Sequence, residues 1–366
     1  MFAAVFLCLN SLYEPMTHNY QFEELPHVYP VLDTNGFIRT VPEDFIVEEE
    51  LGFTASGEGE HIFLHIKKKG RNTEDVSRLL ARFADVARKS VSYAGLKDRN
   101  ALTEQFFSVH LPGKEGPDWK LVDDPGIEIL SVSRHQKKLK RGALSRNNFC
   151  LRIRGFSGSS DDAEQRLQLI KIKGVPNYFA SQRFGHNANN LVFADQMLVS
   201  GKRVKDRFKR NIYYSAARSW LFNLILAERI RRVNWNHAVA GDNLMLNGSR
   251  SCFNVEAVDE EIQNRINAFD IHPTAPLWGR GDAMVKAEAA EIESDILRDW
   301  HGWTKGLEKA RMDMARRAMR VSVADLSWDW LEEDQLQIKF SLPPGSYATA
   351  VLRELGAFTE PEKKRL

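Results

Sequence analysis

The stretch Tyr93-Ala-Gly-Leu-Lys-Asp-Arg99 places one carboxylate, Asp98, between two cations on a loop that begins at a glycine. Adjacent positive charge favours the ionised form of a carboxylate. An ionised carboxylate among cations can act as a nucleophile or can stabilise charge in a transition state. Most single surface charges have no such role, so the interpretation of Asp98 depends on the rest of the chain.

Short elements of both kinds surround this loop. Asn72 is a good N-cap, and apolar residues follow helical spacing through residues 76–86. Residues 149–153 alternate between apolar and other side chains, which indicates a half-buried strand. Further β-prone runs lie at residues 45–47, 61–66, 91–94 and 105–111. This irregular mixture predicts an α+β fold with a mixed, mainly antiparallel sheet rather than a doubly wound fold.

The chain changes character after Gly174-Val-Pro-Asn-Tyr-Phe179. Amphipathic patterns predict one long helix over residues 215–232 and one or two more within residues 283–320. Residues 336–342 alternate again as a strand, and Ser346 is expected to cap a short helix that follows. We therefore expect one mixed domain that is interrupted by a mostly helical insertion.

Composition is that of an ordinary globular protein, with 366 residues, 43% hydrophobic and 27% charged. The net charge is only +2, so a site for a polyanion would have to be a local patch. The three cysteines, Cys8, Cys150 and Cys252, are far apart, which fits a reducing, cytoplasmic compartment. No run of ~18 apolar residues is present, so we expect no membrane span.

The first nine residues, Met1-Phe-Ala-Ala-Val-Phe-Leu-Cys-Leu9, resemble the apolar region of a signal peptide. However, the first Lys or Arg of the chain is Arg39, and no clean small-x-small cleavage site follows. We expect residues 1–15 to be a non-native extension and Met16 to be the natural start. A secreted protein is the alternative.

Two basic clusters suggest a polyanionic partner. The first cluster has no acid among its members, which are Arg134, Lys137, Lys138, Lys140, Arg141 and Arg146. The second cluster is interrupted by a single acid, Asp206, and its basic members are Lys202, Arg203, Lys205, Arg207, Lys209 and Arg210. A charge run is often only a solvated face, but two in a nearly neutral chain indicate structured RNA. Asn147 and Phe149 follow the first cluster, and such side chains can read a base edge or stack on a base. Turn formation and core packing are their more common uses.

These residues belong to seven blocks that stand in a fixed order over about residues 39–355. The blocks are Pro42-Glu-Asp-Phe-Ile-Val-Glu48, Gly57-Glu-Gly-Glu-His61, Gly95-Leu-Lys-Asp98 with Thr103-Glu-Gln105, Lys137-Lys-Leu-Lys-Arg-Gly-Ala-Leu144 with Asn147 and Phe149, Gly174-Val-Pro-Asn-Tyr-Phe179 with Gln182-Arg-Phe-Gly185, Ser215-Ala-Ala-Arg218, and Leu342-Pro-Pro-Gly-Ser-Tyr-Ala-Thr349. One block alone would be weak evidence, whereas seven in order are specific. Their order resembles the tRNA pseudouridine synthase D family.

The resemblance implies a pseudouridine synthase core, here residues 16–172 and 322–366, interrupted by a mostly helical insertion domain over residues 173–321. It implies conversion of uridine to pseudouridine at position thirteen, in the D-arm of transfer RNA. The flipped uridine would enter a pocket beside the RNA-binding surface. We expect no cofactor and no metal, no membrane, and a cytoplasmic monomer whose partner is transfer RNA.

The resemblance also assigns roles to single residues. Asp98 matches the catalytic aspartate, and Arg39 matches a basic position near it where Lys is also seen. Phe45, Asn147 and Phe149 match positions that line the base pocket, and Tyr347 stands where the family often has Phe. The residues expected to hold the RNA backbone are Lys137, Lys138, Lys140, Arg141, Lys202 and Arg203.

Three questions stay open at this point. Asp98 could attack C1′ of the ribose or take a proton in an elimination route. A second class of function is an RNA-binding protein or tRNA folding chaperone with an inactive site. A third is a glycoside or nucleoside hydrolase, which needs a second acid such as Glu48 or Glu104. The product distinguishes the three classes of function, because a synthase yields an isomerised base, an RNA-binding protein leaves the RNA unchanged and a hydrolase releases free uracil.

Overall fold

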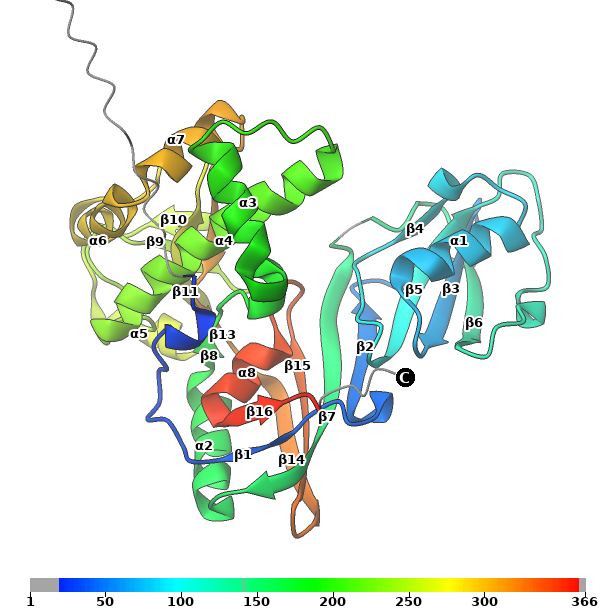
Figure 1. Ribbon diagram of the computed structural model, residues 1–366, viewed down its shortest axis with the longest axis horizontal. Coiled ribbons are helices and arrows are strands. Elements are labelled where there is room, and N and C mark those ends of the chain that lie inside the picture. Colours follow the sequence, from blue (N-terminus) through cyan, green and yellow to red (C-terminus); the bar gives the residue numbers. More distant parts are fainter. Residues whose placement is uncertain (1–19, 141, 362–366) are drawn as a thin grey trace, which may run out of the picture.

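A long sheet forms the centre of the structure, a computed structural model that describes residues 20–140 and 142–361. The ten strands of this sheet include the path β14-β15-β7-β2-β5-β3-β6, with β1, β4 and β16 attached to it (Figure 1). The first fifteen residues, expected to be a non-native extension, and Arg141 lie outside the described residues. The strands are β1 (Asn35–Phe37), β2 (Phe45–Leu51), β3 (His61–Lys68), β4 (Val91–Tyr93), β5 (Leu102–His110), β6 (Ile127–His135), β7 (Leu144–Ser157), β14 (Ala324–Glu332), β15 (Gln335–Leu342) and β16 (Ala357–Thr359).

Strand pairing brings the beginnings of two strands together. β2 runs parallel to β5, with Ile46 beside Leu102, and β1 runs parallel to β16. The remaining neighbours in this sheet are antiparallel, including β7 with both β2 and β15. The expected α+β fold with a mixed, mainly antiparallel sheet is therefore confirmed. Because β2 and β5 are parallel, the loop that precedes β5 lies beside the residues that precede β2.

Separate hydrophobic cores support the two halves of the sheet. Helix α1 (Thr73–Phe83) buries Val76 and Leu80 against the strands around β3 and β5, as expected from its apolar spacing. Asn72 is its N-cap residue. Helices α2 (Ser160–Lys173) and α8 (Ala348–Leu355) pack on the other half, where Leu167 and Val351 share a core with β7 and β15.

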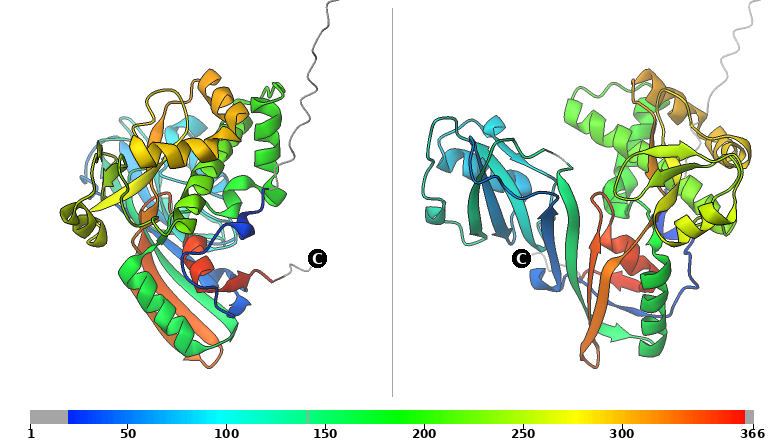
Figure 2. Two further views of the ribbon diagram at one scale, coloured as in Figure 1. Left: turned by 90° about the vertical axis from the view of Figure 1, so that its left-hand side faces the viewer. Right: turned by 180° about the vertical axis from the view of Figure 1, so that it is seen from behind.

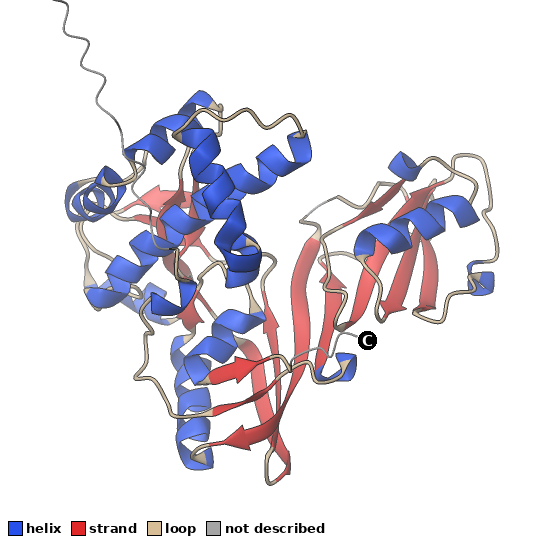
Figure 3. Cartoon of the chain, in the orientation of Figure 1, coloured by secondary structure: helices blue, strands red, loops and turns tan. Residues whose placement is uncertain are grey.

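Most of the remaining helices gather in the segment between β7 and β14 (Figure 3). This part contains a four-stranded sheet of order β10-β9-β11-β12 and a two-stranded ladder of β8 with β13. Figure 1 and the rear view of Figure 2 show it standing apart from α1 and its strands. Its elements are β8 (Val175–Pro176), α3 (Asn189–Leu198), α4 (Arg207–Arg231), β9 (Asn243–Leu246), β10 (Cys252–Asn254), α5 (Glu260–Asn267), β11 (Ile271–Leu277), α6 (Ala287–Arg298), α7 (His301–Lys309), β12 (Ala315–Ala318) and β13 (Arg320–Val321).

The expected helices within residues 283–320 are confirmed as α6 and α7, and the last residues of this segment form β12 and β13. Two other local predictions need correction. The long helix starts at Arg207 rather than residue 215, because the Asp206 carboxylate accepts from the backbone N–H groups of Phe208 and Lys209. Ser346 does not cap α8: the N-cap is Tyr347, and Ser346 donates to Asn177 instead.

The helices in residues 20–140 and 142–361 are all too short or too polar to cross a bilayer. The longest of them, α4, carries basic residues along its length and buries a face that includes Leu221 and Leu226 within the protein.

Candidate active site

The Asp98 loop connects β4 to β5 and is held by side chains from α1 and β5. The backbone N–H of Lys97 donates to Thr73 Oγ1 at 2.9 Å. Gln105 Nε2 donates to the carbonyl oxygen of Gly95 at 2.6 Å, and Thr73 Oγ1 donates to Gln105 Oε1 at 3.0 Å. Because these bonds are buried or partly buried, they fix the backbone of the loop without using Asp98 itself.

Lys68 supports the loop from below. This residue is only 1% exposed, and its ammonium donates to the carbonyl oxygens of Asp98 and Arg71 at 3.0 and 2.9 Å. Burial lowers the pKa of Lys68 to about 8, and the nearby Asp98 charge opposes that shift. The Asp98 carboxylate also accepts from the backbone N–H of Asn100 at 2.9 Å. The loop therefore has a cation beneath its backbone.

Arg39 is the cation that reaches the Asp98 carboxylate. Its Nη2 lies 3.3 Å from Asp98 Oδ2, and the Arg39 side chain is 6% exposed, whereas that of Asp98 is 37% exposed. The guanidinium stacks on the ring of Phe45 at 3.9 Å and also pairs with Glu360 at 2.5 Å. Arg39 has φ of 56°, which is uncommon for a residue other than glycine. The backbone turn, the ring and Glu360 together fix a cation beside an accessible carboxylate.

The two cations next to Asp98 in sequence bind elsewhere. The ammonium of Lys97 lies 3.0 Å from Glu49 Oε1 and donates to Asn147 Oδ1 at 2.5 Å. Arg99 Nε donates to the carbonyl oxygen of Gly70 at 3.2 Å. The arrangement suggested by the sequence is thus corrected: the ion pair of Asp98 is with Arg39, and Lys97 links the loop to β2 and β7.

Glu49 was not singled out by the sequence reasoning. Its side chain is fully buried beside Lys97, and its Oε2 accepts from the N–H of Phe106 at 2.9 Å. Burial raises the pKa of Glu49, and Lys97 opposes the shift. A signal was present, because Glu49 shares one face of β2 with Phe45 and Val47, and a carboxylate in an inward position needs a partner.

Aromatic rings lie on the same side of the sheet. Phe149 is half-buried and stacks on Phe340, with ring centroids 5.3 Å apart at 25°. Phe45 is 4% exposed and meets Phe149 edge to face at 6.4 Å. Since Phe45 also carries the Arg39 guanidinium, the structure brings Arg39, Phe45, Asn147 and Phe149 together around the Asp98 loop.

Tyr347 lies at the next connection, between β15 and α8. Its ring meets Phe179 edge to face, with centroids 6.1 Å apart. Leu342, the last residue of β15, pairs with Asn147, and a turn from Pro343 to Ser346 leads to Tyr347. Tyr347 is therefore placed against the segment that follows β8 rather than in the Phe45 and Phe149 cluster.

Comparison with known proteins identifies the family. The profile of tRNA pseudouridine synthase D matches residues 26–205 and 202–355. The tRNA pseudouridine synthase D of Methylococcus capsulatus is 46% identical over 92% of this chain and 95% of its own. This chain belongs to the tRNA pseudouridine synthase D family. The Aeromonas hydrophila member is 46% identical over 91% of this chain and 94% of its own. A Methanosarcina mazei crystal structure under the same family name aligns with a TM-score of 0.68 at 22% identity over 90% of this chain and 95% of its own, which supports the fold.

In this member of the tRNA pseudouridine synthase D family, the first basic cluster borders the Asp98 loop. Lys137, Lys138 and Lys140 are exposed between β6 and β7. Gly142, just beyond them, donates its N–H to the carbonyl oxygen of Ala94 at 3.3 Å. The three lysines therefore lie in the β6–β7 connection, which contacts the beginning of the Asp98 loop. Arg141, in the same connection, lies outside the described residues.

The second basic cluster comes from the helical part. Lys202 and Arg203 are exposed in the loop before α4, and Lys202 donates to Gln196 at 2.9 Å. Opposite views show the beginning of α4 projecting toward the side that holds β4 and α1 (Figures 1 and 2). The two clusters thus come from opposite parts of the molecule and flank the same side of the long sheet.

The acids considered for a hydrolase face away from this site. Glu48 lies directly beside Glu104 on neighbouring strands, and Glu104 pairs with His65 at 3.3 Å. Glu48 is exposed, whereas its neighbour Glu49 is buried, so successive side chains of β2 point to opposite faces. Neither Glu48 nor Glu104 shares the face of Phe45 and Glu49, and the second acid that a hydrolase requires is not supplied by them.

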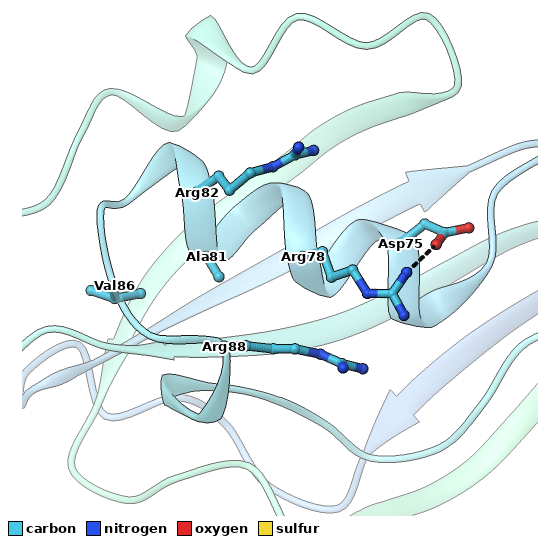
Figure 4. Close-up of a pocket in the computed structure, with 6 residues that line it drawn as sticks. All are labelled: Asp75, Arg78, Ala81, Arg82, Val86 and Arg88. Carbon is cyan, nitrogen blue, oxygen red and sulfur yellow. Dashed lines mark hydrogen bonds and ion pairs between the residues drawn. The ribbon is translucent and has the colours of Figure 1, made fainter.

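A basic pocket also lies on the outer face of α1, apart from the Asp98 loop. Figure 4 shows its arginines with Asp75, which pairs with Arg78 at 3.2 Å. Arg88 pairs with Glu74. Within residues 20–140 and 142–361, no cluster of three or more His, Cys, Asp or Glu side chains is arranged to hold a metal ion.

Proposed function

We propose that this chain converts uridine to pseudouridine at position thirteen in the D-arm of transfer RNA. The relatives that carry the name tRNA pseudouridine synthase D span nearly the whole chain at 46% identity. The observation that carries the site assignment is the 3.3 Å pair between Arg39 and the accessible Asp98 carboxylate. Asp98 lies on a loop whose backbone is fixed by Thr73, Gln105 and Lys68.

The reaction breaks the bond between N1 of uracil and C1′ of the ribose, and forms a bond between C5 and C1′. The C5 proton leaves and N1 gains a proton, so the reaction is redox-neutral and needs no group donor. Asp98 attacks C1′ in one route or takes a proton in an elimination route. Both routes require the ionised carboxylate, and the guanidinium of Arg39 lies 3.3 Å from it.

The aromatic cluster gives a surface for the flipped base. A base that leaves the stack of folded RNA regains about 1–3 kcal/mol when it stacks on an aromatic ring. Phe149, supported by Phe340, borders the uracil on one side, and Tyr347 borders it from the β15–α8 connection. Asn147 positions the loop through Lys97, and Phe45 holds Arg39 in place.

Exposed cations would hold the RNA backbone around this pocket. The proposed residues are Lys137, Lys138, Lys140, Arg141, Lys202 and Arg203. All of them except Arg141 lie within the described residues and are exposed there. Phosphate contacts of this kind supply affinity and register rather than base recognition.

We further propose that the core comprises residues 16–172 and 322–366 and that residues 173–321 form the insertion domain. Support comes from the pairing of Val175 with Val321, which brings the two ends of the insertion together. A cytoplasmic location is proposed as well, because Cys150 and Cys252 are free thiols that suit a reducing compartment. We also propose that the protein is a monomer. Light scattering of the purified protein tests the monomer.

The decisive experiment is carbodiimide mapping of pseudouridine in tRNA from cells that lack this gene. The unaltered gene, Asp98→Asn and Asp329→Asn are restored separately. Asp329 is a matched control because it is an exposed aspartate on β14, away from the Asp98 loop. We expect a D-arm signal with the unaltered and Asp329→Asn forms, and none with Asp98→Asn, which should still bind tRNA.

Other outcomes would separate the parts of this proposal. A signal that returns with Asp98→Asn would mean that this residue is not the catalyst. If no tRNA differs between cells with and without the gene, the substrate assignment fails and an RNA-binding protein without this reaction becomes the better account. Loss of binding together with activity in Asp98→Asn would indicate a structural aspartate.

A further inference from the structure

Two arginines flank one aromatic ring beside Tyr347. The guanidinium of Arg317 lies 4.1 Å from the centre of the Phe179 ring, and that of Arg183 lies 5.8 Å from it. Both residues are half-buried. Neither residue belongs to the basic clusters visible in the sequence, because Arg183 and Arg317 are far apart along the chain.

The groups that accept from these guanidinium ions are neutral. Arg317 Nη2 donates to Asn177 Oδ1 at 2.6 Å and to the carbonyl oxygen of Gly345 at 3.0 Å. Arg183 donates to the hydroxyls of Ser215 and Ser219. Among the ion pairs of residues 20–140 and 142–361, no carboxylate pairs with Arg183 or Arg317. Two positive charges are thus held close together without a counterion in that part of the chain.

Other buried arginines of this protein are compensated. Arg229 pairs with Asp242 at 2.9 Å, and Arg316 pairs with Glu293 at 2.6 Å. Arg320 donates to the carbonyl oxygens of Lys173 and Ile266. These carbonyls lie in the last turns of α2 and α5, where the helix dipole is negative. Arg317 instead contacts the loops around Asn177 and Gly345, which lack such a dipole.

The electrostatic environment agrees with this geometry. Burial lowers the pKa of Arg317 to about 10; Tyr347 opposes the shift and the neighbouring Arg183 adds to it. A ring such as Phe179 attracts a cation but offsets only part of the lost hydration. The pair therefore leaves a positive site that an anion would complete.

This site adjoins the proposed base pocket. Arg317 binds the carbonyl oxygen of Gly345, two residues before Tyr347, and the ring of Tyr347 touches Phe179. Leu342, at the beginning of the same connection, pairs with Asn147. Tyr347 follows Leu342 by about five residues, so the chain limits the distance between them to ~18 Å even if fully extended, and the Pro343–Ser346 turn shortens it.

We propose that Arg183 and Arg317 bind a backbone phosphate of the substrate RNA next to the flipped uridine. Guanidinium ions suit this role because they form strong, oriented bonds to phosphate oxygens. Phosphate binding would supply the missing counterion and would fix the RNA strand relative to Tyr347. This inference rests on the proposed function, since it assigns a subsite to that same reaction.

The test measures tRNA affinity over a range of salt concentrations in the Asp98→Asn background, which prevents turnover. Arg183→Gln and Arg317→Gln are compared with Arg298→Gln, an exposed arginine of α6 whose partner is Asp295. Each subsite variant should lose about tenfold in affinity, and its log–log salt slope should fall by ~0.7 for a single-stranded phosphate. Arg298→Gln should change neither quantity. Thermal unfolding reports whether Arg317→Gln loosens the loop, and Arg317→Lys keeps the charge if it does.

A second measurement separates phosphate binding from a purely structural role. Short D-arm RNAs carry a neutral methylphosphonate at one phosphate in turn, on both sides of the target uridine. When the neutral group replaces the contacted phosphate, the protein that keeps Arg183 and the Arg183→Gln variant should bind the RNA with the same affinity. An unchanged salt slope, or a difference that persists at every position, overturns the subsite. Failure of the proposed function would appear separately, as absence of pseudouridine formation by the unaltered protein on unmodified RNA.

Discussion

Lys97→Met should expose the electrostatic role of the Lys97–Glu49 pair. Glu49 is fully buried, and the ammonium of Lys97 is its 3.0 Å counterion. Methionine retains most of the apolar stem of lysine but removes the charge, so packing changes little. The variant leaves a buried carboxylate whose remaining partner is the N–H of Phe106. Removing one member of a buried pair is far more destabilising than removing both.

The size of this effect is bounded by protonation. An uncompensated Glu49 can take a proton, and at pH 7 neutralising an ordinary glutamate of pKa ~4.3 requires ~3.7 kcal/mol, the product of 2.7 pH units and 1.36 kcal/mol. At pH 5 the same bound is ~1 kcal/mol. Loss of Lys97 raises the pKa of Glu49 further, so the folded variant binds a proton that the unfolded chain does not. The destabilisation relative to the unaltered protein must therefore grow as pH rises.

Urea unfolding at pH 5 and pH 7 measures this difference for the unaltered protein, Lys97→Met and the double variant Glu49→Gln with Lys97→Met. We expect Lys97→Met to lose about 3 kcal/mol at pH 7 and about 1 kcal/mol or less at pH 5. The double variant should recover most of the loss at pH 7, because no buried charge remains. An equal loss at both pH values, or no recovery in the double variant, would refute the reasoning.

Two other properties can be tested in the same protein. Replacing Lys137, Lys138 and Lys140 by Ala should weaken tRNA binding and lower its log–log salt slope by ~0.9 for each duplex phosphate that the variant no longer neutralises. The control variant replaces three other exposed lysines, Lys286, Lys305 and Lys309. An unchanged salt slope would reject the first cluster as an RNA-binding surface. Burial lowers the pKa of His272 to about 4, so its stabilising effect is complete above the unfolded pKa of ~6.5 and disappears as pH falls through about 4. Between pH 7 and 4, the free energy of unfolding of His272→Gln should therefore fall by up to about 3 kcal/mol less than that of the unaltered protein. An equal fall in both proteins, measured by unfolding experiments, would contradict this.

Local patterns predicted the elements around the Asp98 loop because those elements carry strong local signals. The apolar spacing after Asn72 defines α1 without help from distant residues. Asn72 stands at the N-cap position, but its side chain donates to the Asp75 carboxylate instead of accepting from a helix N–H. The contact of Arg39 with Asp98 depends instead on the parallel pairing of β2 with β5. No local periodicity reports that pairing, so the sequence indicated the contact only through the family resemblance.

Distant contacts determine the local structure at the end of the segment 283–320. Residues 315–318 include types that favour helices, but they pair with β11, and Arg316 forms a buried ion pair with Glu293. Tertiary pairing therefore overrides propensity in β12. The early start of α4 has the opposite cause, because Asp206 supplies a local cap within a basic run that lacks an apolar pattern.

The proposed insertion is bonded to the proposed core beside one part of the site. Its two ends lie at the β8–β13 ladder, where Val175 pairs with Val321. Next to this ladder, Asn177 accepts from both Arg317 and Ser346, so the loop that carries Tyr347 is bonded to the insertion. Asp98, by contrast, is held by α1, β5 and Arg39. Asp98 and Tyr347 both belong to the proposed core, but only the Tyr347 loop is bonded to the proposed insertion. We therefore expect changes in the β8–β13 ladder to affect the site through Tyr347 rather than through Asp98.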